Sequence, residues 1–237
     1  MDRFADSSDF VFTFVGDFSI DEMKPYIEKY LGSLPSINRK ENYIDHNVRI
    51  ENKSKYIEVR ENSEEKSVNY RFYSHKFKNN IKNRTKLYIL TKVLKRILRE
   101  EIREKQNLVY SIYADILRTD HFPTQSYTFY ITFDSDPKNN DLIFSEIDRI
   151  LEKLKNGDFE KKYIDEAKLH RINKINEITQ NNSFLAYAIN SYFFENESIT
   201  TINNLDEVVQ SISNYEIVKF SNKTFTDSFI QATLLPK

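Results

Sequence analysis

The sequence of 237 residues contains no cysteine, no tryptophan and only three glycines. Without cysteine it can form neither a disulfide nor a thiolate metal site, so any metal site would need histidines and carboxylates. Its only histidines are His46, His75, His121 and His170, and none belongs to an H-x-x-E-H or H-E-x-x-H zinc-binding pattern. We therefore expect no metal site in this chain. Their surroundings predict His46 and His75 at the surface, His121 in a loop and His170 on the solvent face of a helix.

Long hydrophobic runs and an excess of one charge are also missing. No apolar run approaches the roughly 18 to 20 residues that span a bilayer, and the N-terminus has no signal-peptide pattern. The 35 basic and 36 acidic residues are interleaved and leave a net charge of −1, so no field attracts phosphate backbones or anionic lipid. We expect no membrane span and no nucleic-acid partner.

The first part of the chain predicts one strand and one helix. Residues 9–17 form a β-rich run with apolar side chains on both parities, which favours a strand buried on both faces. Ser19 is a typical N-cap with Glu22 three residues on, and the helix it opens should end near Leu31, before Gly32. Residues 37–53 are polar and aperiodic, which is typical of a linker.

The remaining chain has the patterns of a larger α/β unit. Its predicted strands are residues 56–60, 67–73, 108–116, 126–133 and 226–235. Its predicted helices are residues 80–102, 143–154 ending at Gly157, 160–179, 184–194, and one opened by a Ser213–Glu216 capping box. Residues 108–116 and 126–133 should pair as neighbours.

Two sets of side chains in this unit could have a structural or a functional role. The basic residues of the helix at 80–102 indicate a solvated face rather than a binding patch. Aromatic residues of the helix at 184–194 indicate core packing rather than contact with a ligand. The basic set is Arg84, Lys92, Lys95, Arg96 and Arg99, and the aromatic set is Tyr187, Tyr192, Phe193 and Phe194. The fold class we expect is α/β (α+β): a two-layer sandwich of an antiparallel-rich mixed sheet with helices on one face.

Residues 98–111, L-R-E-E-I-R-E-K-Q-N-L-V-Y-S, carry the chemistry of greatest interest. The pattern predicts Arg103 in the last turn of a helix and Tyr110 at the start of a strand. A guanidinium offers a fork of five donors, and a phenol offers one hydroxyl donor. Such a pair could hold a peptide carbonyl while charge develops on its oxygen. Taken alone, the same residues are more typical of a solvated charge at a helix end and a packed ring in a strand.

The segments 3–19, 30–35 (Y-L-G-S-L-P) and 98–111, in this order and spacing, resemble landmarks of the pitrilysin/insulinase family of zinc metallopeptidases. The resemblance is to the C-terminal half, a metallohydrolase-like half-domain without a metal. In that family two halves enclose a substrate chamber, and the N-terminal half binds zinc through H-x-x-E-H. The resemblance implies that zinc belongs to another half and that this chain alone is inactive.

The resemblance also implies roles for three residues. Tyr110 would hydrogen-bond the developing oxyanion, and Arg103 would hold the substrate carbonyl beside the scissile bond. The spacing of seven between them matches the family's pair. Asn107 would lie at the substrate in the intervening turn, where many relatives have glycine, and asparagine tolerates the left-handed backbone that such a turn requires.

These implications define the expected organisation of the protein. Residues 1–36 would be the strand-helix tail of a preceding domain, 37–53 a linker and 54–237 the C-terminal peptidase-family domain. The expected partners are a zinc-bearing half and a peptide substrate, with a dimer through residues 9–17 if that strand lacks its own sheet. Compartment is open, with the periplasm or cell envelope suggested by the family only. The alternative function is a catalytically inactive structural or peptide-binding subunit of the same fold.

Overall fold

The computed structural model describes residues 5–48, 53–198, 200 and 204–237, and these form two compact units. The first unit comprises residues 1–44 and 173–203, and the second comprises residues 45–172 and 204–237. The expected division at residues 36 and 53 stays a prediction, because compactness alone does not define the domains of a longer protein. No helix of the described residues is long and apolar enough to cross a membrane.

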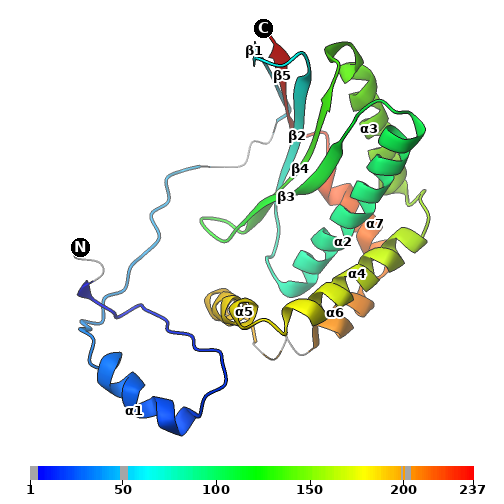
Figure 1. The fold of residues 1–237 in the computed structure, drawn as a ribbon. Helices are drawn as coiled ribbons and strands as arrows, with labels where there is room; N and C mark the ends of the chain where they lie inside the picture. Colours follow the sequence, from blue (N-terminus) through cyan, green and yellow to red (C-terminus); the bar gives the residue numbers. More distant parts are fainter. Residues whose placement is uncertain (1–4, 49–52, 199, 201–203) are drawn as a thin grey trace. The chain divides into compact units, whose positions relative to one another are not determined.

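A mixed five-stranded sheet forms one layer of the second unit (Figure 1). Its order is β1-β5-β2-β4-β3, in which β1 and β5 are parallel and all other neighbours are antiparallel. The strands are β1 Lys55–Asn62, β2 Ser67–Lys76, β3 Ile112–Asp120, β4 Ser126–Ser135 and β5 Ile230–Pro236. The expected pairing of the third and fourth strands is confirmed by the β3–β4 ladder.

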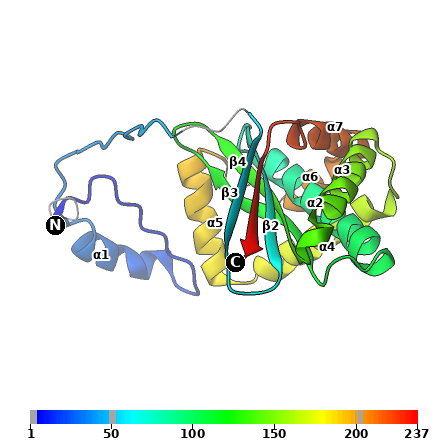
Figure 2. The ribbon, with the colours of Figure 1, turned by 90° about the horizontal axis from the view of Figure 1, so that it is seen from above.

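Helices form the other layer, and α2, α3, α6 and α7 gather on one side of the sheet (Figure 2). The predicted two-layer α/β class is therefore confirmed. The helices of this unit are α2 Ile81–Leu98, η2 Arg99–Lys105, η3 Pro137–Asn139, α3 Asn140–Asn156, α6 Leu205–Ser211 and α7 Asn214–Thr224, and α4 Lys162–Ile178 begins in it. Helix α6 was not predicted, because its seven residues are too few to show a helical period.

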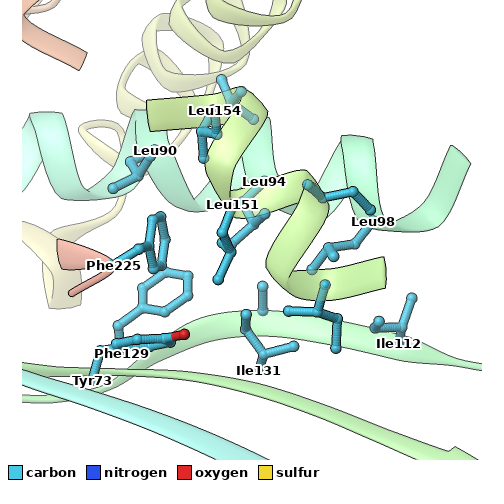
Figure 3. Close-up of a cluster of buried hydrophobic side chains, with 14 of the residues drawn as sticks. Tyr73, Leu90, Leu94, Leu98, Ile112, Phe129, Ile131, Leu151, Leu154 and Phe225 are labelled. Carbon is cyan, nitrogen blue, oxygen red and sulfur yellow. The ribbon is translucent and has the colours of Figure 1, made fainter. Parts of the chain in front are cut away.

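The hydrophobic core lies between these layers (Figure 3). Leu90, Leu94 and Leu98 of α2 and Leu151 and Leu154 of α3 are buried against the sheet. They follow the i, i+3, i+4 spacing of one helical face, while the sheet contributes alternate residues of its strands. The sheet side of the core includes Tyr73, Ile112, Phe129 and Ile131.

Capping residues determine where the helices begin and end. The Ser213 hydroxyl accepts the Glu216 N–H, and the Glu216 carboxylate accepts the Ser213 N–H, so the predicted capping box is present. Gly157 ends α3 with a φ of 75°, in the left-handed region that favours glycine.

The first unit contains α1 Ile20–Tyr30 and α5 Asn182–Glu195. Ser19 caps α1 by accepting the Glu22 N–H, as the sequence predicts. The Thr13 hydroxyl donates to the Asn190 side-chain oxygen at 2.5 Å and joins the N-terminal segment to α5.

Two predictions for this unit are wrong. Residues 9–17 are not a strand, because none of the five strands of the sheet offers them a ladder of backbone partners. Phe10, Phe12 and Phe14 consequently remain 40 to 47% exposed. The aromatic residues of α5 were expected in the core, but only Tyr192 is buried, while Tyr187, Phe193 and Phe194 are exposed. The four aromatic side chains are distributed around the whole circumference of α5, so packing along one face of the helix cannot bury all of them.

Candidate functional site

Arg103 lies in a helical segment that changes type along its length. Helix α2 passes directly into η2, a π-helix, and Arg103 is in its last turn. The helix end expected near residue 102 is therefore later and π-helical, a form that often accompanies functional sites. Ile102, next to Arg103, is fully buried and fixes this segment to the core.

A short turn brings the chain back from η2 to the edge of the sheet. Asn107 adopts a φ of 52°, which confirms the left-handed backbone expected there. The Leu108 N–H donates to the Ile102 carbonyl at 3.2 Å, and Val109 is buried. Tyr110, the next residue, is 83% exposed. Tyr110 was expected to begin a strand, but β3 begins only at Ile112, because the turn delays the pairing with β4.

The structure brings the two predicted active-site residues together. The Arg103 guanidinium carbon lies 5.8 Å from the centroid of the Tyr110 ring. This separation is within the range of a cation–π contact, a weakly favourable interaction that helps to orient both side chains. Asn107 is exposed in the turn that connects them.

The carboxylates around Arg103 have other partners. Glu100, Glu101 and Glu104 form ion pairs with Arg96, Lys105 and Arg99 respectively. In the part of the chain that the structure describes, Arg103 forms no ion pair with any of them. Its guanidinium donors are thus directed to solvent or to a ligand.

Hydrogen bonds also engage two of these carboxylates, Glu100 and Glu101. The Lys105 ammonium, assisted by Arg149, lowers the pKa of Glu101. The Tyr163 hydroxyl donates to Glu100, and this bond raises the pKa of Tyr163. Because these carboxylates already accept hydrogen bonds from other side chains, they compete poorly with a ligand for the Arg103 guanidinium.

The described part of the chain shows no ligand set for a resident metal. Among the described residues, no group of three or more histidine, aspartate or glutamate side chains lies close enough to hold an ion. His170 is exposed, as expected, with Nδ1 2.6 Å from the Tyr88 hydroxyl. His75 was expected at the surface but is half-buried, with Nε2 2.8 Å from the Thr224 carbonyl, because β2 turns it toward the helices. Burial lowers the pKa of His75.

Sequence reasoning missed two further residues beside this site. Lys92 and Lys95 were assigned to a solvated face, yet the Lys95 ammonium lies 5.6 Å from the Tyr113 ring of β3. Only the fold places β3 alongside α2. The available signal was the spacing of residues 88, 92, 95, 99 and 103, which marks one face of a helix.

The fold is shared with solved proteases. Over 94% of its length the chain superimposes on the periplasmic protease PqqL from Escherichia coli (TM-score 0.80, 16% identity). It also superimposes on a protease from Helicobacter pylori (0.76, 18%) and on the ferredoxin protease FusC, solved in complex with Arabidopsis ferredoxin (0.78, 16%), again over 94% of its length. The chain spans 25%, 54% and 24% of those proteins, respectively. Among curated protein sequences, none matches this chain.

Sequence comparison gives the family. Residues 1–170 match the family model described as the Peptidase M16 inactive domain. The chain belongs to this family, and its domain is of the inactive type. The predicted resemblance to the non-zinc, C-terminal half of pitrilysin-like proteases is thereby confirmed.

Proposed function

We propose that this chain is the non-zinc portion of a zinc metalloendopeptidase, where it closes the substrate chamber and supplies Arg103 and Tyr110 to the active site. One observation carries the proposal: an arginine without an ion pair and a highly exposed tyrosine lie side by side on a well-anchored segment. Both groups donate hydrogen bonds, and both are available to a ligand. Family membership supplies the peptidase context.

The two halves of the enzyme would have different roles in catalysis. Zinc, bound by the other half, would polarise the scissile carbonyl and activate water. The Tyr110 hydroxyl would donate to the oxygen on which charge develops. Arg103 would bind the neighbouring substrate carbonyl through its planar fork, and Asn107 would contact the substrate in the turn between them.

Replacing Tyr110 with phenylalanine in the complete protein tests this assignment. Turnover of a peptide should fall by roughly 10²- to 10³-fold, because one donor to the oxyanion is lost. The free energy of unfolding should barely change, since the hydroxyl is in solvent. Tyr215→Phe, at another highly exposed tyrosine, is the control and should retain full turnover.

Arg103→Lys adds a second test. Lysine keeps the charge but loses the bidentate fork, so turnover should fall again. Arg99→Lys is the matched control, because Arg99 lies in the same segment but binds Glu104.

Two results would contradict the proposal. Near-full activity of Tyr110→Phe would show that Arg103 and Tyr110 form only a packing contact. Peptide binding without any cleavage by the wild-type complete protein would favour the alternative, an inactive peptide-binding or structural subunit.

A further inference from the structure

Three cations lie in a row beside the free edge of the sheet. Lys92, Lys95 and Arg103 are on α2 and its π-helical extension. The ammonium of Lys92 lies 5.4 Å from the Tyr88 ring, and that of Lys95 lies 5.6 Å from the Tyr113 ring. With the 5.8 Å contact of Arg103 and Tyr110, each cation rests on a tyrosine ring.

These three cations differ from their neighbours in the same segment. Arg96, Arg99 and Lys105 are neutralised by glutamates. Within the described ranges, Lys92, Lys95 and Arg103 have no carboxylate at ion-pair distance. The segment thus keeps a row of positive charges that are not in ion pairs, although the chain as a whole is nearly neutral.

Two cations of this row, Lys92 and Lys95, are also close enough to repel each other. Partial burial, and then the charge of Lys95, lower the pKa of Lys92, while the carboxylate of Asp115 opposes this shift. Asp115 lies on β3 and is the acidic group that faces the row. The Arg171 guanidinium of α4 also lies 4.6 Å from the Tyr88 ring, but Arg171 has a further interaction of its own and does not belong to the row. An incoming anion would relieve the repulsion between these cations.

The neighbouring strand offers backbone hydrogen bonds. In the described sheet β3 is the last strand and pairs only with β4. Its other edge therefore presents backbone N–H and C=O groups of alternate residues over a length of roughly 30 Å. The Ile116 N–H is an exception, because it donates to the Asp115 carboxylate, and the register with β4 shifts between Ile116 and Arg118. Such an edge can bind an extended peptide as an additional strand.

We propose that the free edge of β3 and the cations Lys92, Lys95 and Arg103 together form a binding groove for an extended, acidic peptide segment. The peptide backbone would pair with β3, and its acidic side chains would meet the cations in alternate positions. The inference rests on the proposed function, because Arg103 and Tyr110 end this row and would hold the same substrate. The groove then selects substrates with carboxylates on one side of the scissile bond.

A binding assay with the 237-residue chain tests the groove without any catalysis. The probes are a fluorescent ten-residue peptide with glutamate at alternate positions and the same peptide with glutamine in their place. The glutamate peptide should bind about tenfold more tightly, and added salt should weaken it, because its exposed charge pairs are screened. Alternate N-methylation of the peptide backbone should abolish binding, since it blocks pairing with β3.

Matched variants locate the site. Lys92→Gln/Lys95→Gln should weaken binding of the glutamate peptide by about tenfold. Lys153→Gln/Lys161→Gln removes the same charge at two other exposed positions, on α3 and just before α4, and should bind like wild type. Hydrogen exchange of residues 112–120 should slow when the peptide is bound.

The outcomes also separate this inference from the proposed function. Equal binding of the two peptides, or wild-type affinity of Lys92→Gln/Lys95→Gln, would overturn the groove. So would equal affinity for inorganic polyphosphate without protection of the β3 amides, because the site would then recognise charge alone. The binding of Lys92→Gln/Lys95→Gln to the peptide tests this inference, whereas the effect of Tyr110→Phe on turnover in the complete protein tests the catalytic assignment separately.

Discussion

Arg71 and Asp148 form an ion pair in which Arg71 is buried and Asp148 is exposed. We therefore expect mutation of the two partners to change the free energy of unfolding by different amounts. Arg71 is only 3% exposed, while the Asp148 side chain is 58% exposed. The Arg71 guanidinium donates to Asp148 and, through Nε and Nη2, to the Gln231 side-chain oxygen at 3.1 and 2.7 Å. It also lies 4.9 Å from the Phe144 ring and 4.5 Å from the Phe229 ring.

Removing each partner has a different cost. Asp148→Ala leaves a buried charge, a change that costs about 3–5 kcal/mol when nothing else compensates. Gln231 and the two rings remain, and each cation–π contact is worth about 0.5–2 kcal/mol, so we expect a loss of about 2–3 kcal/mol. Arg71→Met removes the charge and keeps most of the volume. Because Asp148 then stays hydrated, this variant should lose only about 0–1 kcal/mol.

Urea unfolding of the two variants and of the double variant provides the measurement. Arg71→Met/Asp148→Ala should be about as stable as Arg71→Met alone, since aspartate has no role once the buried charge is gone. The reasoning would be refuted if Asp148→Ala cost less free energy of unfolding than Arg71→Met. Simple addition of the two single effects would refute it too.

The remaining predictions concern other parts of the chain. The Ser213 N–H, followed by Lys82, lowers the pKa of Glu216 from 4.5 to about 2, so its stabilisation is complete above about pH 4.5 and is lost as the pH falls toward 2. Glu216→Ala should therefore cost about 1 kcal/mol at pH 7, and denaturation at several pH values should show the difference vanish near pH 2. Gly157→Ala should lower the free energy of unfolding by about 1 kcal/mol, because alanine is strained at a φ of 75°, and an unchanged thermal midpoint would contradict this. Metal analysis of the purified chain should find no stoichiometric zinc; one tightly held ion per chain would disprove the expectation. If residues 9–17 pair between two copies, light scattering should detect a dimer that deletion of residues 1–36 abolishes, and a strictly monomeric wild-type chain would argue against it.

The sequence by itself determined the features that depend on neighbouring residues. The capping box of Ser213 and Glu216, the glycine end of α3 and the alternation along residues 126–133 were all predicted. Each is decided within a few residues, where backbone hydrogen bonds and side-chain periodicity suffice. The approach of Arg103 and Tyr110 belongs partly to this group, because Asn107 predicts the tight turn between them.

Only the tertiary structure decided which distant segments meet. Residues 9–17 have the composition of a strand, but a strand also needs a partner, and the described sheet has none for them. Conversely, β1 is exposed along most of its length, and its parallel pairing with β5 joins segments more than 150 residues apart. Lys92 and Lys95 became candidates for ligand binding only when the fold placed β3 beside α2. Contacts of this kind depend on packing between elements, which the local pattern of either element does not encode.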